Sequence, residues 1–164
     1  MSECKWEEIN QLTRKFIVKF ITEEEGLFES EEEMIKEMGL DKMKINFGGG
    51  ILQIQNDLSF IPGVIKAGAL SFNGNVYVPE KYEFVFNQRI LYFVTTLLHE
   101  MIHVWQFHRN GRKKTHMFNV LWAFRNGYRN SKYEEEAYEI AGRFRDWLFS
   151  NKYYITALPS VDDI

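Results

Sequence analysis

Two histidines four residues apart, with a glutamate directly after the first, form the most informative pattern of this sequence: His99-Glu100-Met101-Ile102-His103. On a helix, residues four apart lie on one face, so both imidazoles can bind one metal ion. Zinc lowers the pKa of its bound water to roughly 7, and a neighbouring carboxylate can take the released proton. The spacing therefore predicts a catalytic zinc ion with His99 and His103 as ligands and Glu100 as general base.

The simpler interpretation is a pair of ordinary histidines on a surface helix. Against it, the motif follows an uncharged run from Ile90 to Leu98. A buried polar trio needs partners, and a metal ion supplies them. We therefore predict a buried helix from about 87 to 107, whose polar strip faces metal and substrate. The strip consists of Thr96, His99, Glu100, His103 and Gln106.

A catalytic zinc ion usually has three protein ligands and an open fourth position. Of the four histidines, His108 lies on the same helix but roughly 140° around its axis from His103, which excludes it. His116 opens the next predicted helix, beyond a turn, and is the favoured third ligand. The alternative is Glu136, as a ligand or as a hydrogen-bond partner of a ligand histidine. For Glu134 we expect a capping role at the start of the last helix.

The predicted N-terminal elements are two helices. Apolar residues recur at helical spacing from Trp6 to Phe20. Ser30 and Glu33 form a capping-box pattern for a short second helix, which Gly39 ends.

The middle of the chain predicts a small antiparallel sheet. Residues 51–55 have the pattern of a strand, and residues 69–72 and 75–78 flank Asn73-Gly74, a strong hairpin signal. Two further helices are expected at about 115–124 and from Ser131 onward. The last helix has a stripe expected to pack on the core, formed by Tyr133, Ala137, Ile140, Ala141, Phe144 and Leu148.

Composition indicates one globular α+β domain, since 45% of the 164 residues are hydrophobic and 16% aromatic. We divide it into a helical part (1–45), a sheet (46–80) and metal-binding helices (85–150). The single cysteine excludes a disulfide framework and a cysteine-rich zinc ribbon. No apolar run is long enough to span a bilayer and no signal peptide is visible, so we expect a cytoplasmic protein without membrane contact. The oligomeric state is not indicated.

These residues together resemble the SprT-like zinc metalloprotease family. The resemblance runs from about Gly68 to Leu121 and comprises a hairpin, the segment 99–106, a basic turn containing glycine, and His116 with Phe118 two positions on. His116 follows His103 by 13 residues, similar to the family's spacing of its second and third zinc histidines. Met117 stands where members often have glycine.

The resemblance implies a zincin-like minimal metalloprotease domain with one Zn²⁺ per chain. It makes His99, His103 and His116 the ligands and Glu100 the general base. The resemblance also implies that the substrate is a protein or peptide. Some members of the family act on proteins attached to DNA, so proteins associated with nucleic acid are a further, weaker expectation.

A basic turn bears on nucleic acid as a partner. Arg109, Arg112, Lys113 and Lys114 could contact phosphates. Because the whole chain carries a net charge of −3, we favour the alternative of a solvated turn whose cations stabilise a helix C-terminus.

The predicted function is a zinc-dependent endopeptidase. Its substrate would pair with a hairpin strand, at 70–72 or 75–78, by strand addition. Candidate donors to the transition state are Tyr128, Tyr133 and Arg125, which the sequence does not rank. Two alternatives are a zincin with Glu136 as third ligand and another substrate, and a catalytically silent, zinc-stabilised binding module. The intact Glu100 argues against the second, because a structural site needs no general base.

Overall fold

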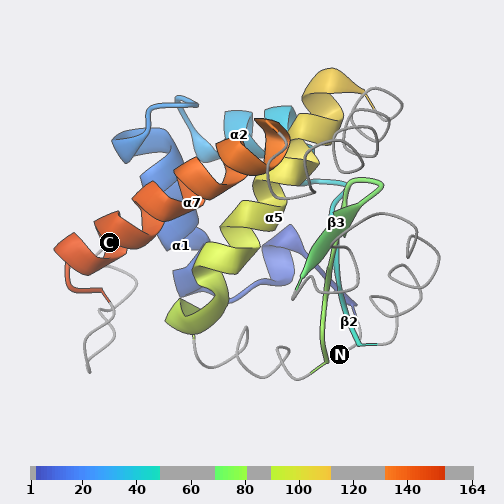
Figure 1. Cartoon of the computed structure of the whole chain (residues 1–164), viewed down its shortest axis with the longest axis horizontal. Coiled ribbons are helices and arrows are strands. Elements are labelled where there is room, and N and C mark those ends of the chain that lie inside the picture. The colour runs from blue at the N-terminus through green and yellow to red at the C-terminus, as the bar shows by residue number, and fades with distance from the viewer. Residues whose placement is uncertain (1–2, 49–68, 81–89, 112–131, 154–164) are drawn as a thin grey trace.

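The computed structural model describes residues 3–48, 69–80, 90–111 and 132–153, and they form an α+β fold (Figure 1). The α-helices of this part are α1 (Gln11–Lys19), α2 (Glu31–Met38), α5 (Ile90–Asn110) and α7 (Lys132–Ser150). Its strands are β1 (Glu3–Lys5), β2 (Lys44–Phe47), β3 (Leu70–Phe72) and β4 (Asn75–Val78). The helix expected at 115–124 and the strand expected at 51–55 lie outside the described residues.

The first predicted helix is divided into three pieces. A 3-10 turn (Trp6–Glu8) precedes α1, and a π-helical turn (Phe20–Glu24) follows it. The helix starts anew because the side chain of Asn10 accepts a hydrogen bond of 2.9 Å from the backbone N–H of Leu12, which caps α1. The apolar periodicity is confirmed, since its residues are buried in the core despite the interruption.

Helix α2 begins and ends where the sequence predicts. Ser30 Oγ accepts a hydrogen bond of 3.2 Å from the backbone N–H of Glu33. The carboxylate of Glu33 accepts from the N–H of Glu29 at 2.7 Å, one residue before the cap. Gly39 ends the helix with a φ of 73°, a left-handed conformation that glycine adopts without steric cost.

The sheet is mixed, so the prediction of an antiparallel sheet is wrong. Its strand order is β1-β2-β4-β3, and β2 pairs with β4 in parallel, whereas the other two pairings are antiparallel. The long connection between β2 and β4 permits the parallel arrangement. The hairpin is confirmed, with positive φ at Asn73 (53°) and Gly74 (77°), as a type I′ turn requires. Strand β1 and half of β2 come from residues 1–45, the part expected to be helical.

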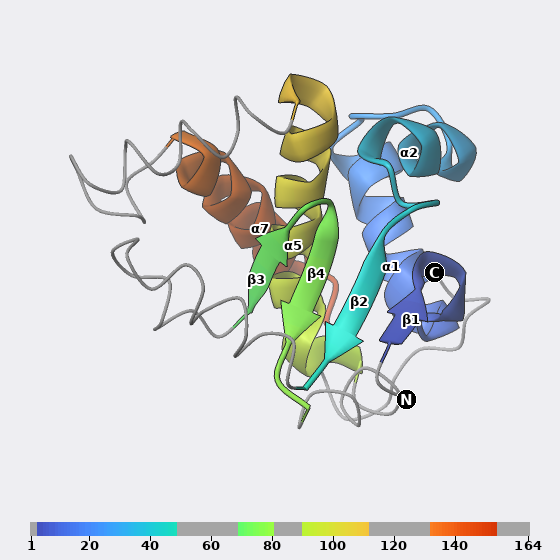
Figure 2. The ribbon, with the colours of Figure 1, turned by 90° about the vertical axis from the view of Figure 1, so that its right-hand side faces the viewer.

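Helix α5 lies at the centre of the described fold. It contacts α1, α2 and α7 as well as β3 and β4, and in Figure 2 it crosses behind these two strands. Its side chains Val94, Leu97, Leu98 and Met101 have no solvent exposure, which confirms the predicted buried helix. It runs three residues beyond the predicted end, to Asn110, where Gly111 (φ 82°) follows.

Helix α7 packs against α5 through the predicted stripe, all six residues of which are buried. This packing brings the first turn of α7 next to the motif on α5. Among the helices that the structure describes, none is long and apolar enough to cross a membrane.

Candidate metal centre

The two motif histidines of α5 meet a glutamate from the first turn of α7. Nε2 of His99 lies 3.2 Å from Oε2 of Glu134, and Nε2 of His103 lies 3.0 Å from Oε1 of the same carboxylate. The two Nε2 atoms are 3.2 Å apart. Because α5 places residues 99 and 103 on one face, a single side chain on the facing helix can reach both rings.

The three side chains lie close enough together to bind one metal ion. Two donors bound to one zinc ion at about 2.0–2.1 Å in tetrahedral geometry lie roughly 3.3 Å apart. The two Nε2 atoms are 3.2 Å apart, close to this value, and each lies 3.0–3.2 Å from a different oxygen of the Glu134 carboxylate. Two histidines and one glutamate are also an established ligand set for catalytic zinc, with the fourth position open.

The cluster is largely shielded from solvent and carries opposing charges. The side chains of His99, His103 and Glu134 are 13%, 11% and 5% exposed. Burial by itself would raise the pKa of Glu134, but hydrogen bonds with His103 and His99 hold it well below its usual range. Burial would lower the pKa of His103, but the Glu134 carboxylate raises it to about 9. Without a metal ion, a proton on His103 therefore balances the buried carboxylate.

Glu100 is buried beside the histidines, with 6% of the residue exposed. Burial raises its pKa, while the charges of His103 and His99 oppose this shift. A carboxylate whose pKa is raised toward neutrality accepts a proton more readily than an ordinary glutamate. Burial beside the histidines thus makes the Glu100 carboxylate a stronger proton acceptor than an exposed glutamate.

A second set of contacts surrounds His103. Its Nδ1 lies 2.7 Å from Oε1 of Gln106, and the amide nitrogen of Gln106 donates to the Tyr133 carbonyl at 2.9 Å and to the Glu136 carboxylate at 2.7 Å. Arg109 donates two hydrogen bonds to the same carboxylate, at 3.2 and 2.8 Å. Gln106, expected on the strip facing metal and substrate, is instead fully buried.

The expectations for three residues change accordingly. The Glu136 carboxylate, predicted as an alternative ligand or as a partner of a histidine, binds Gln106 and Arg109, and Gln106 takes the position next to His103. Arg109, predicted to contact phosphate, pairs with Glu136 and stacks over the Trp105 ring at 4.5 Å. Tyr133, predicted as a transition-state donor, is 3% exposed.

The remaining predicted residues lie outside the described part of the chain. They are His116, Tyr128, Arg125, Arg112, Lys113 and Lys114. Their roles stay predictions.

Two residues at the site were not predicted from sequence as part of it. Glu134 was expected to cap α7, and both its oxygens face the histidines. Glu134 lies three residues before Ala137 and seven before Ala141, on the stripe that packs against the core. This spacing could have indicated that its side chain faces α5. Tyr138, one turn after Glu134, is half exposed and its ring lies 4.5 Å from the ring of His99.

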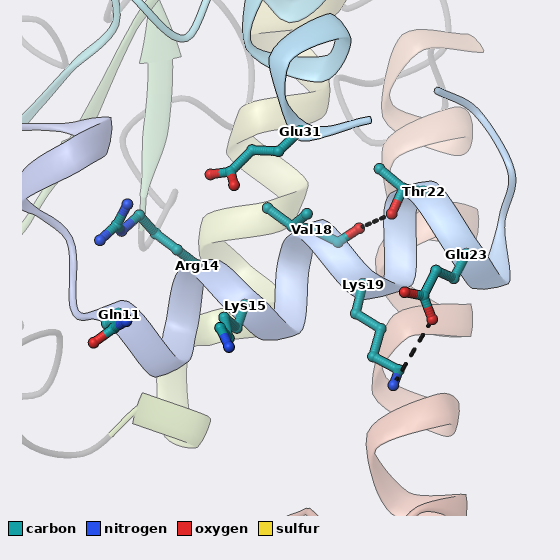
Figure 3. A pocket seen from close by; sticks show the side chains of 8 residues that line it. All are labelled: Gln11, Arg14, Lys15, Val18, Lys19, Thr22, Glu23 and Glu31. Atoms are coloured by element: carbon teal, nitrogen blue, oxygen red, sulfur yellow. Dashed lines mark hydrogen bonds and ion pairs between the residues drawn. The ribbon is translucent and has the colours of Figure 1, made fainter. Parts of the chain in front are cut away.

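A surface hollow on α1 is separate from the metal centre, because none of its lining residues belongs to α5 or α7 (Figure 3). It measures about 280 Å³ and contains an ion pair of 3.7 Å between Lys19 and Glu23. Its cations and carboxylates are mixed, so it shows no preference for a charged ligand. The lining residues are Gln11, Arg14, Lys15, Val18, Lys19, Thr22, Glu23 and Glu31.

No protein-family model, curated protein or solved structure matches this chain. The SprT-like resemblance stays a prediction, and the part of it after Gly111 lies outside the described residues.

Proposed function

We propose that this chain is a zinc-dependent metallopeptidase with His99, His103 and Glu134 as metal ligands and Glu100 as general base. The observation that supports it is the convergence of both Nε2 atoms on one buried carboxylate, at 3.2 and 3.0 Å. Three ligands leave one position open, which is typical of catalytic rather than structural zinc. His116 then need not be a ligand, and this differs from what the family resemblance implies.

The chemistry divides between the metal ion and Glu100. A bound zinc ion supplies a Lewis acid for the scissile carbonyl and lowers the pKa of water. Glu100 takes the proton of the attacking water and later gives it to the leaving amine, so that one proton moves and no other reactant is needed. Its burial supports both steps, because a raised pKa makes the carboxylate a better proton acceptor and still lets it release the proton to an amine.

The sheet favours β3 over β4 as the place where a substrate main chain would pair. Within the described sheet, β4 lies between β2 and β3, so both its edges are occupied. Among the described strands, β3 lies at the edge of the sheet, and it contacts α5. A protein or peptide segment could add to β3 and extend along the helix that carries the catalytic residues. Nucleic acid association has less support, since Arg109 is paired with Glu136.

Zinc analysis combined with a peptide-cleavage assay tests the proposal. We expect about one zinc ion per chain in the wild type and in Glu100→Gln, with cleavage lost only in the variant. Glu139→Gln, on the exposed side of α7, is the matched control and should keep both. Cleavage by a zinc-loaded Glu100→Gln protein would refute the role of Glu100. Absence of zinc from the reconstituted wild type would remove the basis for an enzyme.

The silent binding module remains the alternative function. It predicts a wild type that holds zinc but cleaves no peptide, and a Glu100→Gln variant with the same binding partners. The buried carboxylate with a raised pKa beside the histidines favours the enzyme.

A further inference from the structure

We infer that Gln106 is a positioning residue that holds ligands from both helices in place, an inference that rests on the proposed metal site. Gln106 lies one turn after His103 on α5 and has no solvent exposure. Its side-chain amide contacts the ring of the ligand His103 and also Tyr133 and Glu136, which lie on either side of the ligand Glu134 in the sequence. Its three hydrogen-bond contacts therefore reach residues on both helices of the centre.

The orientation of the Gln106 amide follows from its partners. The Tyr133 carbonyl and the Glu136 carboxylate are both acceptors, at 2.9 and 2.7 Å from one amide atom. That atom must be the NH₂ group, because only it can donate two hydrogen bonds. The carbonyl oxygen of Gln106 therefore points at His103.

This orientation decides which nitrogen of His103 can bind a metal ion. Oε1 of Gln106 can only accept, so Nδ1 of His103, 2.7 Å away, must carry a hydrogen. The neutral ring then has its lone pair on Nε2, the atom that faces Glu134 at 3.0 Å. Gln106 thus selects the tautomer that the metal site needs.

The same amide ties the second helix to the first. Tyr133 precedes Glu134 and Glu136 follows two residues later, so the two hydrogen bonds of the amide hold the turn that carries the third ligand. Arg109 lies three residues after Gln106 on α5 and donates one hydrogen bond to each oxygen of the Glu136 carboxylate. A single buried side chain consequently fixes His103 and the first turn of α7 together.

Gln106→Met and Gln106→Glu separate the hydrogen bond to His103 from the two hydrogen bonds to the first turn of α7. Methionine has a similar length but loses all three hydrogen bonds. Glutamate keeps an acceptor for Nδ1–H of His103 and loses the donors for Tyr133 and Glu136. Gln11→Met, on the distant helix α1, is the control for a glutamine-to-methionine change.

The first measurement is the Nδ1–H signal of the His103 ring, by ¹⁵N-resolved NMR on the metal-free protein, where neither zinc nor activity contributes. Because the metal-free ring carries a hydrogen on both nitrogens, this signal tests the hydrogen bond to Gln106: we expect slow exchange with solvent in the wild type and in Gln106→Glu, and fast exchange in Gln106→Met. The second is zinc affinity, by competition with a chromophoric chelator. Loss of a partner behind a metal ligand lowers affinity roughly 10–100-fold, and we expect this range for both variants.

A Gln106→Met protein with the wild-type ring signal and zinc affinity would overturn the inference. If Gln106→Met does not fold, Gln106→Glu still tests the inference. Wild-type zinc affinity of Gln106→Glu would show that the hydrogen bonds from Gln106 to Tyr133 and Glu136 do not hold the third ligand in place. A wild type that shows the ring signal but binds no zinc would instead overturn the proposed function, and with it the role of Gln106 in metal binding.

Discussion

Replacing Glu134 by glutamine, with Glu136→Gln as the matched control, tests the ligand set most directly. The two changes are chemically identical and lie on the same turn of α7. In the structure only Glu134 faces the histidines, with its oxygens 3.2 and 3.0 Å from their Nε2 atoms. Glu136 bonds to Gln106 and Arg109 instead.

The expected magnitudes differ because one residue would touch the metal ion and the other would not. Loss of a residue behind a ligand costs roughly 10–100-fold in metal affinity. Loss of a charged ligand should cost at least ~100-fold, or about 2.8 kcal/mol. For Glu136→Gln we expect about tenfold or less, since glutamine still offers an oxygen to Gln106 and Arg109.

The assay is a zinc titration of metal-stripped protein against a competing chelator at pH 7, with circular dichroism to confirm folding. Folding should survive Glu134→Gln, because both histidines can become neutral once the carboxylate charge is removed. Adding His116→Ala completes the test. If Glu134→Gln keeps wild-type affinity while His116→Ala loses zinc, the three-histidine set implied by the SprT-like resemblance is right and the ligand set proposed from the structure is wrong.

Three further predictions concern the proton of His103, the contact of Tyr138 with His99, and the fold. Zinc binding at pH 7 should release about one proton, because the pKa of His103 is raised to about 9 and the ring must be deprotonated to bind zinc. Calorimetry in buffers of different ionisation enthalpy measures the number of protons released. Release of the same proton at pH 10 would contradict the prediction. Tyr138→Ala should lower kcat/KM about three- to tenfold, the value of one aromatic contact, whereas Tyr138→Phe and the zinc content of both stay near wild type. Gly26→Ala should lower the free energy of unfolding by about 1–2 kcal/mol, because its backbone has positive φ. Gly39→Ala should lower it by more, because Gly39 also has positive φ and, unlike at Gly26, a Cβ there would meet the side chain of His108. Equal losses in chemical denaturation would exclude that contact.

Local signals of the sequence predicted elements well where a few neighbouring residues decide them. Ser30 and Gly39 mark the ends of α2 because capping and left-handed backbone depend on single residues. Asn73-Gly74 predicted its hairpin for the same reason. The strands β1 and β2 were missed, since three or four residues carry too little periodicity and both strands depend on partners distant in sequence.

The third ligand shows the same division within the site. Spacing along one helix is enough to place His99 and His103 together, because helical geometry is fixed. Choosing among Glu134, Glu136 and His116 requires the rotation and position of the next helices relative to α5. Packing of the α7 stripe sets that rotation, and it directs Glu134 at the histidines and Glu136 at Arg109.

Residue types and their spacing were enough to predict the groups at the centre: two imidazoles and a carboxylate on one turn of a buried helix. These follow from the period of the α-helix and from the apolar residues around the motif. The approach of Glu134 to within 3.2 Å of both rings, and of the Gln106 amide to the first turn of α7, follow from tertiary packing. Contacts between helices depend on how whole faces pack, and no local pattern encodes the register of one helix against another.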